Sequence, residues 1–276
     1  MVSLKGFART AAARVLVTVM LAALAGPALA DQADLTRALT LYNARQFDQA
    51  IDAALAARKA PETQDAASVV LARALLERYR ERVDPADLAA AREALGSVRT
   101  GMLDARGRLE YLLAIGQALF LEDEFGAAAN VFASGIEPGR DLDPVLGESL
   151  LDWWGSAIER QADSSEPDMR KALFGRLARQ MAEQLSSRPG SAAAAYWVAA
   201  ALRGTGDALA GWHAATAGWA RARLAGERSA ALRADLDKLV LQGIIPDRVR
   251  VLAASDRPAA ELQLRAEWEL IKERWR

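Results

Sequence analysis

Apolar residues along this chain recur at intervals of three and four positions, and beyond residue 30 no long stretch alternates apolar with polar residues. A spacing of three to four places side chains on one face of an α-helix. Turn-forming residues interrupt the pattern about every 15 to 20 positions; they include Asp84-Pro85, Pro138-Gly139, Gly204-Thr205-Gly206, Gly226 and Pro246. The pattern predicts an all-α protein made of successive short antiparallel helices.

The clearest pair of predicted helices lies in residues 109–138. Two apolar stripes define it: Leu112, Ile115, Gly116 and Leu119 on the first helix, and Phe125, Ala128, Phe132 and Gly135 on the second. The acidic turn Glu122-Asp123-Glu124 separates the two helices. We expect the two stripes to pack against each other inside the pair.

This pair resembles the tetratricopeptide repeat. In that family, large residues of the first helix pack around a small one, here Gly116, and a small residue early in the second helix, here Ala128, lets the helices approach closely. Segments 35–57 and 72–98 fit the repeat less well, and weaker pairs follow to about residue 224. The small residues Ala50, Ala91 and Ala128 are 41 and 37 positions apart, whereas the family repeat is about 34. The resemblance implies a right-handed α-α superhelix, or solenoid, of antiparallel helix pairs.

The last predicted helix, within residues 258–276, has a different pattern. Its apolar residues form one stripe, Leu264, Trp268, Ile271 and Trp275, and its remaining face is almost wholly charged. A solenoid needs an end helix with one polar face to close its exposed core. We therefore expect a repeat array over residues 31–245 and C-terminal capping helices over residues 246–276.

Residues 1–30 have the features of a secretory signal peptide. Three basic residues precede an apolar stretch at 15–26, and Ala28-Leu29-Ala30 offers the small residues that signal peptidase accepts. An uncleaved anchor is the alternative, but about 12 apolar residues fall short of the roughly 20 needed to cross a bilayer. We expect cleavage after Ala30 and a periplasmic or secreted protein without a membrane span.

The composition excludes several kinds of chemistry. There is no cysteine and only one histidine, His213, which rules out Cys/His nucleophilic sites, Cys-rich zinc sites and multi-histidine metal sites. The formal net charge of −1 becomes about −4 once Lys5, Arg9 and Arg14 are removed with the signal peptide. Such a chain is not expected to bind nucleic acid. We expect no cofactor, no metal and no catalytic activity.

Two further features have both a functional and a structural interpretation. The Glu122-Asp123-Glu124 turn could be a cation site, but acidic residues also favour the start of the helix that follows. Trp212 and Trp219, like Trp268 and Trp275, are seven positions apart and so share a helical face. Such pairs could bind a sugar or peptide, although aromatic side chains at this spacing more often fill the space between stacked helices. The structural interpretation is favoured for both.

The resemblance also implies a concave wall, lined mainly by first helices, that holds a peptide or a partner helix. On the best repeat, the residues at positions resembling those that face this groove are Glu110, Leu113, Gln117 and Phe120. The alternative is that Leu113 and Phe120 pack against the preceding repeat. The sequence predicts an exported scaffold that binds a protein or peptide partner in the cell envelope. A helical carrier of an apolar or glycan ligand, or a non-catalytic part of an envelope glycan-processing complex, is the alternative.

Overall fold

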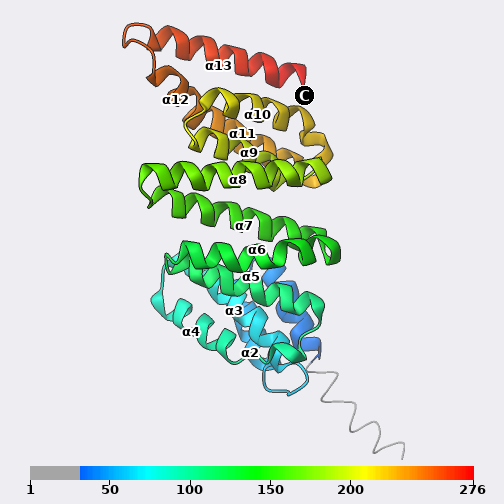
Figure 1. The fold of residues 1–276 in the computed structure, drawn as a ribbon. Coiled ribbons are helices and arrows are strands. Elements are labelled where there is room, and N and C mark those ends of the chain that lie inside the picture. The colour runs from blue at the N-terminus through cyan, green and yellow to red at the C-terminus, as the bar shows by residue number, and fades with distance from the viewer. Residues whose placement is uncertain (1–31) are drawn as a thin grey trace, which may run out of the picture. The chain divides into compact units, whose positions relative to one another are not determined.

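The structure is a computed structural model that describes residues 32–276, and every regular element in this range is helical (Figure 1). The predicted all-α fold is thereby confirmed for these residues. The predicted signal peptide and its cleavage site after Ala30 lie outside them. The chain divides into two compact units at residues 118 and 119. We call residues 32–118 the N-terminal unit and residues 119–276 the C-terminal unit.

The N-terminal unit consists of consecutive helices. After helical residues 32–43 come α2 (Phe47–Ala57), α3 (Gln64–Arg82), α4 (Pro85–Gly96), the 3-10 turn η1 (Thr100–Met102) and most of α5 (Ala105–Leu121). Helix α2 packs against α3, and α3 against α4. Helix α4 begins as the sequence predicts, because the Asp84 side chain accepts a hydrogen bond from the backbone N–H of Ala86 and Pro85 occupies the first turn.

Helix α5 buries a different face from the one that we expected. Leu112, Ile115 and Leu119 are only half-buried. The buried residues of this helix are instead Leu109, Leu113, Ala114, Gly116, Gln117 and Ala118. Apolar residues occur on nearly all sides of α5, so its sequence pattern does not single out one buried stripe.

The C-terminal unit is a longer series of helices. It contains α6 (Phe125–Leu142), α7 (Pro144–Asp163), α8 (Pro167–Ser187), α9 (Ala192–Gly204), α10 (Ala208–Arg221), η2 (Ala222–Arg228), α11 (Ser229–Leu239), the π-helical turn η3 (Val240–Ile244), α12 (Ile245–Arg250) and α13 (Arg257–Arg274). Neighbours in sequence from α6 to α10 pack side by side (Figure 1). The alternate helices α7, α9 and α11 also contact one another, α7 with α9 and α9 with α11. Within this unit the helices therefore form two layers, as in an α-solenoid.

Two predicted helix breaks are absent from the C-terminal unit. Helix α6 continues past Pro138 to Leu142, although the proline removes one backbone N–H donor. The close approach of α7 supports this segment, since a Cβ atom on Gly147 would lie only 2.8 Å from the backbone nitrogen of Arg140. Pro246 likewise does not end a helix. The wider π turn just before it relieves the clash that a proline ring makes with the preceding turn.

The continuous helical stretch formed by α11, η3 and α12 spans residues 229–250. The expected boundary between residues 245 and 246 falls inside it. The two compact units meet at residues 118 and 119, and the division into a repeat array and capping helices stays a prediction.

Three tryptophans form a buried cluster at the C-terminal end. Trp268 of α13 is fully buried, with its ring centroid 5.7 Å from that of Trp212 and 5.5 Å from that of Trp219, both on α10. Its indole N–H donates a hydrogen bond of 2.8 Å to Asp237. The structural interpretation is therefore confirmed for these three residues. Trp275, which we expected in the same stripe, is 49% exposed.

The outer face of α13 is less polar than its sequence pattern suggested. Leu262 is 72% exposed and Leu270 is 61% exposed. The outer face of α13 therefore carries large apolar side chains as well as charged ones. None of the helices between residues 32 and 276 has the combination of length and apolar character that crossing a membrane requires.

Candidate functional site

The residues predicted to face a groove on α5 have little open surface. Leu113 and Gln117 are each 4% exposed, so neither offers a surface to a partner in this conformation. Glu110 is already paired, with its carboxylate 3.2 Å from the Arg73 guanidinium and 3.0 Å from that of Arg106. The side-chain oxygen of Gln117 is buried without a hydrogen-bond partner in the part of the chain that the structure describes.

Phe120 falls in the C-terminal unit. Its ring packs edge-on against Phe125 at 5.3 Å and against Trp153 at 5.2 Å between centroids. This half-buried residue therefore supports the hydrophobic core there. Partner binding by Glu110, Leu113, Gln117 and Phe120 stays a prediction, and their burial or pairing directs attention to another surface.

The other candidates from the sequence occupy structural or exposed positions. His213 is exposed on α10. The Glu122-Asp123-Glu124 segment forms the turn before α6, and Asp123 has the positive φ of 61° that closes this turn. Among residues 32–276, no three His, Cys, Asp or Glu side chains are grouped so that they could hold a metal ion.

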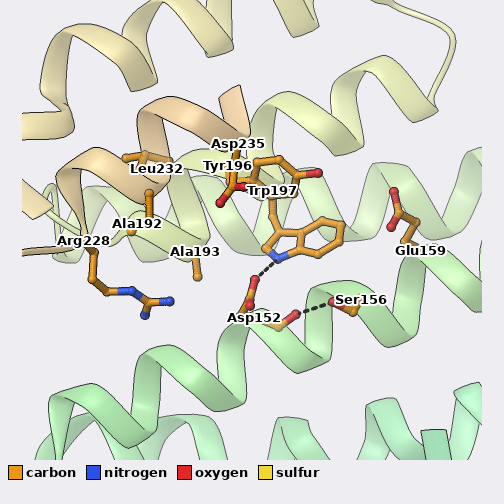
Figure 2. A pocket seen from close by; sticks show the side chains of 11 residues that line it. Asp152, Ser156, Glu159, Ala192, Ala193, Tyr196, Trp197, Arg228, Leu232 and Asp235 are labelled. Carbon is orange, nitrogen blue, oxygen red and sulfur yellow. Dashed lines mark hydrogen bonds between the residues drawn. The ribbon is translucent and has the colours of Figure 1, made fainter. Parts of the chain in front are cut away.

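A row of adjoining hollows follows one face of the C-terminal unit. Three cavities, of about 310, 600 and 250 Å³, follow α9: α7 also lines the first and second, α11 also lines the first and third, and α8, α10 and α12 add to the second. The first and second share Glu159, the first and third share Tyr196 and Asp235, and the second and third share Arg203. We call this continuous feature the groove, and its first cavity, shown in Figure 2, the central pocket.

Helical spacing explains why these side chains line one wall. Groove residues on α7 are Asp152, Ser156, Glu159 and Asp163, and those on α9 are Ala193, Tyr196, Ala200 and Arg203. Successive members of each set are three or four positions apart, which places them along one face of their helix. Helix α11 adds Leu232, Asp235 and Leu239 at the same spacing, with Ala231 and Lys238 next to them.

The floor of the central pocket is fixed by Trp197. This side chain is buried, and its indole N–H donates a 2.9 Å hydrogen bond to the Asp152 carboxylate (Figure 2). A Cβ atom on Gly155 would lie 2.5 Å from the Trp197 ring, so only glycine allows α7 and α9 to approach this closely. The contact holds the Asp152 carboxylate in a defined position between the two helices.

Three polar groups of the central pocket have no protein partner. Glu159, Asp235 and the Tyr196 hydroxyl form neither an ion pair nor a hydrogen bond with any residue between 32 and 276. Arg228 lies at the opposite end of the pocket from Glu159 (Figure 2). Its guanidinium is 3.8 Å from the carboxylate of Glu148.

Burial and nearby charges shift the pKa values of Asp152, Glu159 and Tyr196. Burial raises the pKa of Asp152, although the Trp197 hydrogen bond acts in the opposite direction. Burial also raises the pKa of Glu159, and the nearby charge of Asp163 adds to this effect. Burial, followed by the negative charges of Glu159, Asp235 and Asp152, raises the pKa of Tyr196 to about 12. Arg228 partly offsets the shift at Asp152, and Arg203, Arg160 and Arg170 partly offset the shift at Glu159, so the central pocket, with three carboxylates and one guanidinium in its lining, keeps an excess of negative charge.

The arginines of the second cavity are paired with carboxylates, Arg170 with Asp163 and both Arg203 and Arg250 with Asp247, and the third cavity is also lined by Lys238. The Arg203 guanidinium donates a 2.6 Å hydrogen bond to Asp247, which also pairs with Arg250 at 2.7 Å. Gly243 of the π turn makes room for this arrangement, because a Cβ atom there would lie 2.8 Å from the guanidinium carbon of Arg203. Arg203 thus adds little net positive charge to the groove.

Comparison of the chain with family models, with curated proteins and with solved structures finds no match. The candidate site accordingly rests on the arrangement of α7, α9 and α11. Sequence inspection missed it, although polar residues at three-and-four spacing on α7 were a usable signal. That spacing identifies the polar face of α7. It does not indicate which other helices line the groove together with α7.

Proposed function

We propose that the protein is an exported, tetratricopeptide-like scaffold that binds a segment of a cell-envelope protein in the groove along α7, α9 and α11. One observation carries this proposal: alternate helices turn one face each toward a continuous row of hollows. Helical repeat proteins use such walls to hold an extended peptide or a helix. A right-handed superhelix closed by α13 at its C-terminal end is part of the same proposal.

The composition of the wall favours a polypeptide over an apolar ligand. Charged side chains of α7, α9 and α11 alternate with Tyr196, Leu232 and small alanines. Protein interfaces commonly combine aromatic contacts with polar groups that fix register by hydrogen bonds. A carrier of lipid would need an apolar cavity, whereas carboxylates line these hollows.

Export is tested by N-terminal sequencing of the protein from its native host. We expect the mature chain to begin at Asp31, because the segment ending at Ala30 has the small residues that signal peptidase accepts. A soluble product that keeps Met1 would contradict export.

The groove is tested by blocking it. Ala231 is exposed and lines the central pocket, whereas Ala234 is exposed on the same helix and lines none of the cavities described above. Ala231→Trp should therefore abolish capture of the partner from an envelope extract, and Ala234→Trp should leave it unchanged. Circular dichroism should show the same helix content for both variants.

Either of two results would count against the scaffold. Equal capture by Ala231→Trp and by the unaltered protein would place the partner outside the groove. If lipid or glycan copurified in place of a polypeptide, and if the Ala231→Trp variant lost it, the carrier would be favoured.

A further inference from the structure

The central pocket carries an excess of negative charge. Asp152, Glu159 and Asp235 line it, and the basic residue among its lining side chains is Arg228, which pairs with Glu148. Ionised carboxylates that lie in one pocket repel one another, which costs free energy. A positively charged group that entered the pocket would remove this cost.

The geometry points away from a metal ion and toward a larger cation. The carboxylates come from α7 and α11 and do not form a group that could coordinate one metal, as is true throughout residues 32–276. The pocket volume of about 310 Å³ is roughly ten times the space that one water occupies in the liquid. It can therefore admit a guanidinium or ammonium group together with its aliphatic stem.

An aromatic wall completes the pocket. Figure 2 shows Tyr196 beside Asp235, with Glu159 farther along the same wall. The Tyr196 and Trp197 rings pack edge-on with centroids 5.0 Å apart. Aromatic rings attract cations and pack well against the methylene stems of Arg and Lys, and the Tyr196 hydroxyl is free to accept a hydrogen bond.

We propose that the central pocket binds an arginine or lysine side chain of the partner segment, with Glu159 and Asp235 as its counter-charges and Tyr196 as its wall. The Asp152 carboxylate, which Trp197 holds in place, lies beneath this side chain and adds to the attraction. This inference rests on the proposed function and adds a requirement: the bound segment is basic at the position that enters the pocket. It also explains why these two carboxylates have no partner among residues 32–276.

The test begins with a random 12-residue peptide library displayed on phage and selected on the purified protein. Selected peptides that compete with one another are resynthesised, with each arginine replaced by citrulline or each lysine by norleucine. One replacement should weaken binding about tenfold or more, because a charge-assisted hydrogen bond contributes about 1.5 to 3 kcal/mol. Fluorescence anisotropy gives the dissociation constants.

Variants of the protein assign this effect to the pocket. Glu159→Gln combined with Asp235→Asn keeps the shape of both side chains and removes two charges, so it should weaken binding of the basic peptide to a similar extent. It should also abolish the preference for arginine over citrulline. Glu183→Gln is the matched control, because Glu183 is exposed on α8 and its side chain has no partner among the described residues. The control should bind as the unaltered protein does.

The outcomes separate the inference from the function on which it rests. Peptides that bind, are blocked by Ala231→Trp and show no need for a basic residue would overturn the inference and leave the scaffold intact. Selection of peptides that Ala231→Trp does not block, or of none at all, would overturn both. Retention of the arginine preference in the double variant would place the basic side chain outside this pocket.

Discussion

In the N-terminal unit, Arg78 of α3 bonds to Asp48 of α2 at 2.8 Å and to Asp87 of α4 at 2.9 Å, so one guanidinium links three helices. In the groove of the C-terminal unit, Glu159 and Asp235 have no such partner. The first arrangement is complete within the chain and stabilises packing. The second leaves charge available to a molecule from outside, as expected of a binding surface.

The ionisation of the buried carboxylates follows the same division. Burial acts to raise the pKa of Asp65, but hydrogen bonds from the side chain and backbone of Arg99 outweigh it, so the pKa is lowered. Burial raises the pKa of Glu159, and no hydrogen bond compensates it. At neutral pH the ionised Asp65 thus stabilises the N-terminal unit, whereas the ionised Glu159 destabilises the C-terminal unit.

The largest effect that we expect concerns the tryptophan cluster of the C-terminal unit, where three buried rings pack together. Trp268→Ala should lower the free energy of unfolding by about 3 to 5 kcal/mol, since it removes a fully buried ring and a hydrogen bond to Asp237. Urea unfolding measures this loss. Trp275→Ala is the control and should cost only about 0.5 kcal/mol, because that ring is half exposed. Equal losses in the two variants would contradict a core role for Trp268.

A smaller loss of unfolding free energy is expected from a substitution in the N-terminal unit. Asp65→Asn weakens the hydrogen bonds from Arg99, of 2.7 Å to the backbone N–H and 2.8 Å to the guanidinium, and should cost about 1 to 2 kcal/mol at pH 7. The Arg99 side chain is 58% exposed, which keeps the loss at this modest level.

The pH dependence of this loss has a definite sign. Because the folded-state pKa of Asp65 is lowered, its contribution is present above the ordinary value of 3.8 and is lost as the pH falls through the folded pKa. The exposed Asp52→Asn is the control for urea unfolding at pH 7 and at pH 3. A loss that persists unchanged at pH 3 would mean that the charge of Asp65 is not its source.

The smallest effect that we expect is a gain in stability from a substitution at Glu159. It tests most directly the contrast between paired and unpaired carboxylates. The folded-state pKa of Glu159 is raised, so its ionisation opposes folding as the pH rises above its ordinary value of 4.5. Glu159→Gln should therefore stabilise the protein at pH 7, by about 0.5 kcal/mol as is usual for a partly exposed site. The gain should disappear below pH 4, where glutamate is protonated in both states. Asp163 raises this pKa further whereas Arg203, Arg160 and Arg170 lower it, so burial, the largest cause, sets the sign of the gain. A destabilised Glu159→Gln at neutral pH would mean that the carboxylate has a structural partner.

Local features of the fold could be read from the sequence where one short segment determines the outcome. Asp84 and Pro85 start α4 as expected, and the glycines at 204 and 206 mark the turn before α10. The buried positions of Trp212 and Trp219 followed from their spacing. In each case the deciding contacts lie within one or two turns of helix.

Features that depend on distant packing could not be read in this way. Pro138 normally ends a helix, but contact with α7 keeps α6 intact. The buried face of α5 was misjudged because this helix is apolar on most sides. The central pocket combines Asp152 with Asp235, and no local pattern indicates that α7 and α11 flank α9 on the same wall. Only the three-dimensional arrangement brings those carboxylates together.

Gly243 gives this groove an unusual means of adjustment. A methyl group at this position would displace the Arg203 guanidinium, and with it the hydrogen bond to Asp247. Arg203 already lines the cavity that Tyr196 and Asp235 also line, so its guanidinium would take a new position within that cavity. A single change at a residue without a side chain would thus alter the charge that a partner encounters while leaving every ionisable residue in place. In the proposed scaffold, partner preference could therefore be altered through Gly243, a residue that carries no charge of its own.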